Sequence, residues 1–457
     1  MSELMGGEAG RLFAALDREP VVSIRLNRPK LAAVSSFCEL SPAARVPWAT
    51  DGFYLSSRPA FTYDPLFHAG AYYVQEASSM FAGLALRSVA DAPLRMLDLC
   101  AAPGGKSTLY RSLLPEGSLL VANEPMRQRV RVLAENLAKW GHPDVVVTNN
   151  FPADFAPLSG FFDVVAVDAP CSGEGMFRKD AQAVSEWGEA NVEMCSRRQR
   201  EIVGDVWPAL RPGGYLLYST CTYNTHENEE NVAWIAETLG ADVVRLSVDE
   251  DWGITGNLLS PSGGVPVYRF LPHKTCGEGL FVALLRKHEG ENSRPIRMRR
   301  GRRPEAKAVV PSVCKGWLAD GRRFSWERNG TVVSAVREAL AADVAALCDV
   351  LRVVCAGVTV AEEKGRAWIP QQELALSTVF NAEAFPRAEL DYGAALSYLR
   401  GEAVVLPREV PCGLVCLTYR NLPLGFAKNL GNRANNLYPD AWRIRSSHLP
   451  DEPPRVC

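Results

Sequence analysis

Two cysteines follow apolar runs of the kind that form β-strands, so each thiol would stand where a strand ends. Cys171 follows FFDVVAVDAP, and Cys221 follows GYLLYST. A single cysteine at a strand end is more often a small buried apolar residue than a nucleophile. Two thiols that converge on one crevice, with Asp168 three residues before the first of them, favour nucleophilic chemistry instead.

These residue types suit the addition of an electrophile to carbon 5 of a pyrimidine. That carbon is a poor nucleophile, but a thiolate that bonds to carbon 6 converts it into an enamine-like carbon that accepts an electrophile. An acid near ring nitrogen 3 would stabilise the adduct, and Asp168 is placed for that task. The residues by themselves leave open which of the two thiols attacks.

A glycine-rich turn, DLCAAPGGKS, follows an earlier apolar run and opens a helical pattern. Small residues let the backbone approach a ligand, and the start of a helix presents free N–H groups. The phosphate-binding pattern G-x-x-x-x-G-K-[ST] fails, since its first glycine would fall on Cys100, and the pattern G-x-G-x-x-G is absent. Glu124 ends the run LLVANE, where an acid would accept hydrogen bonds from ribose hydroxyls. We expect a nucleotide-like ligand; the alternative is a tight turn followed by a structural acid.

The elements that must position these residues alternate along residues 91–288. Short runs rich in Val, Leu and Ile are separated by helical patterns, which predicts a parallel sheet covered on both faces. In such a doubly wound α/β domain, ligands bind outside the carboxyl ends of the strands. The turn, the acid and both cysteines are therefore expected at one edge of one sheet.

Composition excludes several classes of protein. The 457 residues are 47% apolar and 22% charged, which is typical of a globular chain of several domains and not of a fibrous or disordered one. The net charge is −2, so the chain has no overall excess of basic residues of the kind that a nucleic-acid coat protein has. RNA contacts must therefore come from local basic segments, such as RPIRMRRGRR at 294–303. Lys428, Arg433, Arg443 and Arg445 form a second such segment, interleaved with aromatic and amide side chains.

Neither a membrane nor a metal is expected. No apolar run approaches a membrane span, and the N-terminus has no export signal, which predicts a cytoplasmic protein. The 12 cysteines include no C-x-x-C pair, and Cys412 and Cys416 lack a matching second pair for a zinc site.

Four motifs, taken in order and spacing, carry a family resemblance: LDLCAAPGGKS, ANEP, VDAPCSGEGMFRK and YSTCT. Across roughly residues 20–285 the chain resembles the NOL1/NOP2/Sun family of RNA 5-methylcytosine methyltransferases. Its C-terminal segment is similar to the RNA-binding part, with a PUA-like end, of the bacterial 16S ribosomal RNA subgroup called RsmF. The resemblance implies S-adenosylmethionine as cofactor. It also implies a Rossmann-like methyltransferase domain, with an N-terminal α/β extension and a C-terminal PUA-like RNA-binding region.

The resemblance also implies roles for individual residues. Cys221 would attack carbon 6, Cys171 would assist product release, and Asp168 would hold ring nitrogen 3 and face the cofactor. Relatives often have an acidic residue at the adenine, where this chain has Asn149 and Asn150, and either amide could bond there. Arg178 and Lys179 would, with Lys106, lie near substrate phosphates. The remaining cofactor contacts would be Cys100, Ala101, Ala102, Pro103, Gly104, Gly105, Lys106, Glu124 and Arg129.

We therefore expect an enzyme that methylates carbon 5 of specific cytosines in 16S ribosomal RNA, free or in the small ribosomal subunit. The alternative is a transfer RNA methyltransferase of the same family. A P-loop nucleotidase is disfavoured by the missing glycine, and a catalytically inactive RNA-binding protein is disfavoured because both cysteines and Asp168 are present. The expected domains are an N-terminal RNA-binding extension (1–90), a catalytic domain (91–288), a basic linker (289–308) and a C-terminal RNA-binding region (309–457).

Overall fold

The computed structural model describes residues 2–32, 44–260, 264–290, 310–446, 449–454 and 456. The expected basic linker lies, from residue 291 onward, outside the described residues. Within the described ranges, no helix is long and apolar enough to cross a membrane.

A nine-stranded sheet forms the centre of the molecule, in the order β10-β11-β8-β7-β4-β5-β6-β14, with β9 also paired to β11. Strands β4 to β8 run parallel, whereas β9, β10, β11 and β14 pair antiparallel. The chain moves outward from β4 to β6 and then returns to the other side of β4 with β7, so the strand order reverses between β4 and β7. The strands are β4 (Arg95–Asp98), β5 (Leu119–Asn123), β6 (Val145–Thr148), β7 (Phe162–Asp168), β8 (Leu210–Thr220), β9 (Ala241–Val244), β10 (Tyr268–Phe270), β11 (Leu280–Lys287) and β14 (Val353–Ala356).

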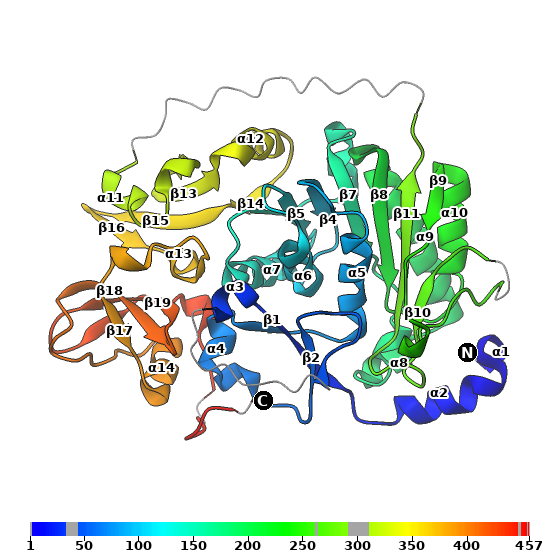
Figure 1. The fold of residues 1–457 in the computed structure, drawn as a ribbon, viewed down its shortest axis with the longest axis horizontal. Coiled ribbons are helices and arrows are strands. Elements are labelled where there is room, and N and C mark those ends of the chain that lie inside the picture. Colours follow the sequence, from blue (N-terminus) through cyan, green and yellow to red (C-terminus); the bar gives the residue numbers. More distant parts are fainter. Residues whose placement is uncertain are drawn as a thin grey trace.

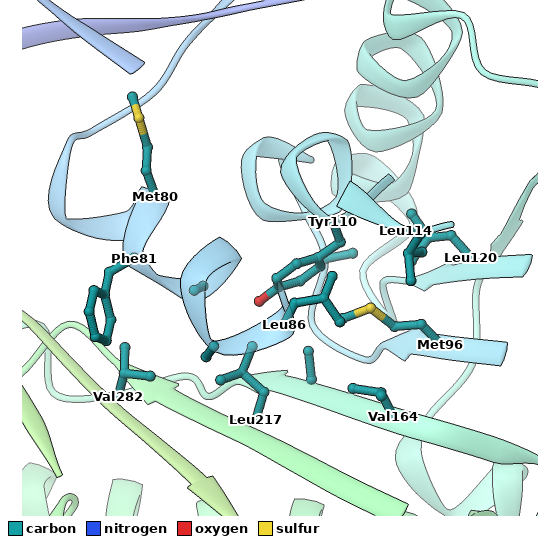
Figure 2. Close-up of a cluster of buried hydrophobic side chains, with 14 of the residues drawn as sticks. Met80, Phe81, Leu86, Met96, Tyr110, Leu114, Leu120, Val164, Leu217 and Val282 are labelled. Carbon is teal, nitrogen blue, oxygen red and sulfur yellow. The ribbon is translucent and has the colours of Figure 1, made fainter. Parts of the chain in front are cut away.

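Helices cover both faces of this sheet, which confirms the predicted doubly wound architecture (Figure 1). Alternate strand residues enter opposite cores, so Met96 packs on one face and Leu97 on the other. In the first core, Leu86 and Tyr110 lie over the strand residues Val164 and Leu217 (Figure 2). The first face carries α5 (Ala82–Arg87), α6 (Gly105–Leu113) and α7 (Arg127–Trp140), and the second carries α9 (Glu189–Val206), α10 (Glu229–Leu239) and α12 (Ala341–Val350).

The described residues form three smaller sheets beside the central one. The N-terminal one has the order β2-β1-β3, with β1 (Val22–Leu26), β2 (Gly52–Leu55) and β3 (Tyr72–Val74). The first C-terminal sheet contains β12 (Phe324–Asn329), β13 (Val332–Arg337), β15 (Val358–Lys364) and β16 (Ala367–Pro370). The last contains β17 (Arg387–Glu389), β18 (Gly413–Tyr419), β19 (Leu422–Asn429) and β20 (Ala434–Asn436).

The remaining helices are mostly short. They are α1 (Ser2–Met5), α2 (Ala9–Leu16), α3 (Arg28–Leu31), α4 (Pro65–His68), α8 (Ala181–Glu186), α11 (Ser312–Lys315), α13 (Gln372–Leu376) and α14 (Tyr392–Leu399). The N-terminal and the last C-terminal sheets share a core, in which Ile24 and Tyr72 pack with Tyr398 and Leu417. The two ends of the chain are therefore joined by apolar packing.

One strand of the central sheet comes from the C-terminal region. Strand β14 pairs antiparallel with β6, and α12, just before it, places Val344 and Leu347 in the second core. The central sheet and its core thus extend beyond the expected catalytic range of 91–288 into residues of the expected C-terminal region.

This continuity can be tested with two residues of α12. Leu347 is fully buried, whereas Val350 on the same helix is 39% exposed. We expect Leu347→Ala to lower the free energy of unfolding by about 2–5 kcal/mol, because a cavity opens in the core of the catalytic sheet. The exposed control Val350→Ala should change it by less than about 0.5 kcal/mol. Urea unfolding followed by circular dichroism measures both; equal midpoints for the two variants would mean that α12 does not support this core.

Candidate active site

The two cysteines meet because β7 and β8 are parallel neighbours. Asp168 is in register with Ser219, so both strands leave the sheet at the same edge. The Sγ atoms of Cys171 and Cys221 lie 3.1 Å apart, within hydrogen-bond distance. The hydroxyl of Ser219 donates to Oδ1 of Asp168 at 2.8 Å. Both thiols and the carboxylate predicted from the sequence are therefore brought together.

The pair of thiols is electrostatically asymmetric. A hydrogen bond from the Cys171 thiol lowers the pKa of Cys221, and the nearby ammonium of Lys106 acts in the same direction against burial and Asp168. The same hydrogen bond and burial raise the pKa of Cys171 well above its ordinary range. A lower pKa raises the fraction of thiolate, the form in which a cysteine acts as a nucleophile.

An ion pair connects the glycine-rich turn to these thiols. Nζ of Lys106, in the first turn of α6, lies 2.8 Å from Oδ2 of Asp168. Burial disfavours the ammonium, but Asp168 outweighs that effect and raises the pKa of Lys106. The turn after β4 and the end of β7, which flank the point where the strand order reverses, are therefore fixed to each other.

The turn itself presents unused hydrogen-bonding groups. Gly104 has a φ of 112°, a conformation that favours glycine, and it precedes α6 without a side-chain cap. The first amides of α6 can therefore bind an anion. Asp98, which ends β4, accepts from Ser107 at 2.6 Å through Oδ2, and its buried Oδ1 has no partner among the described residues. Burial raises the pKa of Asp98 to about 7, against the effect of the Ser107 hydrogen bond.

The other predicted cofactor residues line the same edge. Glu124, which is 2% exposed, accepts from the Met126 amide at 3.0 Å. Nη1 of Arg129 lies 3.6 Å from the Glu124 carboxylate, and its Nη2 donates to the Ala102 carbonyl at 2.7 Å. Arg129 thus bridges the ends of β4 and β5. Cys100, Ala101 and Ala102 are largely buried, and Pro103 is exposed.

Asn149 and Asn150 form structural hydrogen bonds. The Asn149 side-chain amide donates to the carbonyls of Glu124 and Pro125, at 2.8 and 2.9 Å. Asn150 accepts the Arg352 amide at 3.0 Å, and the Asn149 amide donates to the Arg352 carbonyl. Both residues thus join the end of β6 to the residue that precedes β14. Their side-chain NH2 groups have protein partners.

Two exposed apolar side chains near this edge were missed by the sequence analysis. Met126 follows β5 and is 59% exposed, and Phe151 follows β6 and is 68% exposed. Because β5 and β6 are parallel neighbours, the two side chains stand at adjacent strand ends. Their position three residues beyond a strand is the signal that could have found them.

Arg178 and Lys179, which were expected near substrate phosphates, both contact the carboxylate of Glu278. Arg178 is buried: it pairs with Glu278 at 2.9 Å and donates to the carbonyl of Gly277. Its guanidinium therefore serves the fold, and the expectation for Arg178 is wrong. Lys179 is partly exposed and lies 3.3 Å from the same carboxylate. Among the described residues, no cluster of His, Cys, Asp and Glu could hold a metal ion.

The chemical groups along this edge fit S-adenosylmethionine. The free amides of α6 suit its carboxylate, Glu124 suits ribose hydroxyls, Met126 and Phe151 offer apolar surface to a flat base, and the unpaired oxygen of Asp98 suits a positive charge. Fold and site together define a Rossmann-like methyltransferase that uses S-adenosylmethionine.

Family models and relatives identify the family. Residues 86–286 match the model of the 16S rRNA methyltransferase RsmB/F, residues 1–77 match the N-terminal domain of 16S rRNA methyltransferase RsmF, and residues 385–444 match the RsmF PUA domain. A ribosomal RNA small subunit methyltransferase F of Erwinia tasmaniensis is 32% identical over 440 residues, covering 91% of this chain and 89% of the relative. The chain belongs to the RsmF family of 16S ribosomal RNA methyltransferases.

Solved structures agree with this fold. A methyltransferase homolog from Pyrococcus horikoshii is similar with a TM-score of 0.51 and 27% identity, covering 63% of this chain and 92% of that protein. The structure titled PH0851 is similar with a TM-score of 0.55 and 25% identity, covering 63% and 64% of the respective chains. The expected PUA-like end is confirmed by the family match.

The asymmetry of the thiols predicts a pH dependence. Alkylation by iodoacetamide requires the thiolate, so its rate rises with pH through the pKa of Cys221. Cys171→Ala removes the hydrogen bond that favours the Cys221 thiolate, and we expect the midpoint of the pH profile to move to higher pH. Cys171→Ser keeps a donor and should lie closer to the native profile. Mass spectrometry of the Cys221 peptide reports the rate; an unchanged midpoint in Cys171→Ala would contradict the assignment of the donor.

The position of Glu124 at the end of β5 predicts that its replacement lowers cofactor affinity. Glu124→Gln should weaken binding of S-adenosylmethionine by about 1–3 kcal/mol, the usual cost of losing a charged hydrogen-bond acceptor. Glu116→Gln, at an exposed position before β5, is the matched control and should bind normally. Isothermal titration calorimetry gives both dissociation constants. If Glu124→Gln bound as tightly as the control, Glu124 would have only its structural bond to Met126.

Proposed function

We propose that this protein methylates carbon 5 of cytosine in 16S ribosomal RNA, through a covalent bond between Cys221 and carbon 6 of the base. The observation that supports this most strongly is the contact of two thiols beside Asp168, at the strand edge that also carries the glycine-rich turn. A methyltransferase that acts on a nitrogen or oxygen atom has no use for such a pair, because those atoms already carry a lone pair.

The steps follow from the protonation states of the thiols. The Cys221 thiolate bonds to carbon 6, and the displaced electron pair makes carbon 5 nucleophilic. When bound, S-adenosylmethionine supplies the methyl group that carbon 5 takes up. Asp168, which contacts Lys106 and Ser219, would interact with ring nitrogen 3 as charge builds up on the ring.

Release requires transfer of the carbon 5 proton to a solvent water, and the electron pair left behind re-forms the double bond between carbons 5 and 6 and expels the Cys221 sulfur as a thiolate. A hydrogen bond to a departing thiolate stabilises it. The Cys171 thiol lies 3.1 Å from that sulfur and keeps its proton, since its pKa is raised. We therefore assign the release step to Cys171.

The cofactor would be held by the turn from Cys100 to Lys106, by Glu124 on the ribose, and by Met126 and Phe151 on the adenine, with Arg129 orienting Glu124 and with Asp168 at the methyl end. Asn149 and Asn150 would shape this pocket mainly through their bonds to the backbone. The N-terminal extension and the C-terminal region would bind the RNA, free or in the small ribosomal subunit, in the cytoplasm.

Two variants test both the chemistry and the order of the thiols. Cys171→Ala should still attack and methylate but fail to release, leaving RNA bound through Cys221 in a complex that survives denaturing electrophoresis. Cys221→Ala should abolish methyl transfer, and the double variant should form no complex. A band from Cys221→Ala alone would reverse the two roles, and no band from either single variant would contradict the covalent mechanism.

The RNA substrate can be identified by carrying out the methylation reaction with the native protein. Bisulfite sequencing after incubation of 16S ribosomal RNA, small subunits and transfer RNA with S-adenosylmethionine should locate new 5-methylcytosine only in the first two. Modification confined to transfer RNA would replace the proposed substrate with the alternative one.

A further inference from the structure

Two buried carboxylates lie in the loops that carry the thiols, and the proposed chemistry does not use them. Glu174 follows Cys171 by three residues and is 1% exposed. Glu227 follows Cys221 by six residues and is fully buried. Each carboxylate bonds to the loop that carries the other cysteine.

Glu174 holds the loop of Cys221. Its Oε2 accepts the Thr222 hydroxyl at 2.8 Å and the amides of Tyr223 and Asn224 at 2.7 and 2.8 Å. Its Oε1 accepts the indole N–H of Trp187 at 2.9 Å. Four donors thus fix this carboxylate, and three of them belong to the three residues that follow Cys221.

Glu227 holds the loop of Cys171 in return. It accepts the amide of Ser172, the residue next to Cys171, at 3.0 Å. It also accepts the side-chain amides of Gln199 at 2.6 Å and Asn224 at 2.8 Å. The pairing is therefore reciprocal: each loop supplies one carboxylate and receives the other.

The backbones of the two loops also touch directly. The Gly175 amide donates to the Cys221 carbonyl at 2.7 Å, and a Cβ on Gly175 would lie 2.4 Å from that oxygen. The hydroxyls of Ser172 and Thr222 lie 3.0 Å apart. The two loops are therefore in direct backbone and side-chain contact at this point.

Neutral donors surround both carboxylates, which distinguishes them from two other buried acids, Glu229 and Asp144. Glu229 pairs with Arg269, and Asp144 pairs with Arg337 at 2.9 Å, whereas neither Glu174 nor Glu227 has an ion-pair partner among the described residues. Burying a carboxylate without a cation is costly even when its oxygens are bonded. The presence of such a carboxylate at each cysteine loop indicates that the geometry of the two loops matters for the function of the protein.

We propose that Glu174 and Glu227 are positioning residues that form a reciprocal clamp, which holds the thiols of Cys171 and Cys221 in contact. Glu174 fixes the loop of the attacking thiol, and Glu227 fixes the loop of the thiol that assists release. Only this division between attack and release rests on the proposed function; the contact between the thiols does not.

The contact can be measured in the full-length protein without RNA. An aromatic disulfide, 5,5′-dithiobis(2-nitrobenzoate), reacts with the Cys221 thiolate to give a mixed disulfide and one arylthiolate. The Cys171 thiol, losing its proton to solvent, then displaces the second arylthiolate and closes a Cys171–Cys221 disulfide. The rate of this second step, followed by mass spectrometry of the two peptides, reports how closely the thiols are held.

We expect Glu174→Gln and Glu227→Gln each to slow the second step at least tenfold. Asp144→Asn is the matched control, since it removes a buried carboxylate that touches neither loop, and it should close the disulfide at the native rate. Asn224→Ala removes two hydrogen bonds with Glu227 and the bonds of the same side chain to Ser172 and Thr222, but leaves both carboxylates in place. It should give a smaller slowing in the same direction and serves if a glutamine variant does not fold. Native rates in the folded glutamine variants, or equal slowing in Asp144→Asn, would overturn the clamp.

Methylation kinetics then distinguish the roles of the two carboxylates. Glu227→Gln should accumulate the covalent RNA complex, as Cys171→Ala does, whereas Glu174→Gln should lower the rate of methyl transfer without a change in KM for S-adenosylmethionine. If both variants instead raised that KM and left the rate unchanged, the carboxylates would act on the cofactor and the proposal would fail. A failure of the proposed function would be recognised separately, because Cys171→Ala would give no complex while the disulfide still closed rapidly in the native protein.

Discussion

The register of β7 against β8 is the constraint on which the catalytic edge depends. Asp168 stands opposite Ser219, and from that level each strand needs only two or three further residues to reach its cysteine. A slip of one residue in a strand would turn every side chain of that strand to the other face. The register is protected because both faces are buried, with Val165 and Val167 in one core and Val164 and Ala166 in the other. Apolar packing thus determines where the thiols emerge.

Beyond the ends of the strands, polar contacts hold the loops in position. The ion pair of Lys106 with Asp168 ties the cofactor turn to the thiols, and the carboxylates of Glu174 and Glu227 tie the two cysteine loops together. Side-chain hydrogen bonds have definite lengths and directions, which apolar contacts lack. This edge therefore combines the rigidity of a buried sheet with the directional precision that positioned thiols require.

Periodicity and motif order predicted the parallel sheet, the edge that carries the site, and the meeting of Cys171, Cys221 and Asp168. Strand β14 was not predicted, because a four-residue strand far along the chain gives no sign of its partner. The burial of Arg178 could not be predicted from the sequence either, because its partner Glu278 lies 100 residues away along the chain. Glutamates such as Glu227 resemble surface residues in a sequence, and only tertiary packing shows that they are buried.

The contribution of β14 to the central sheet also bears on how the chain is synthesised. Until residue 356 has been made, β6, which pairs with β5 on its inner side, is the edge strand of that sheet, and its outer side has no partner strand. About 200 residues separate β6 from β14, so at roughly 5–20 residues per second the nascent chain leaves this edge open for about 10–40 seconds. An open apolar edge strand is a template for pairing with other chains. Synthesis of the C-terminal region through β14 therefore also closes an edge at which other chains could pair.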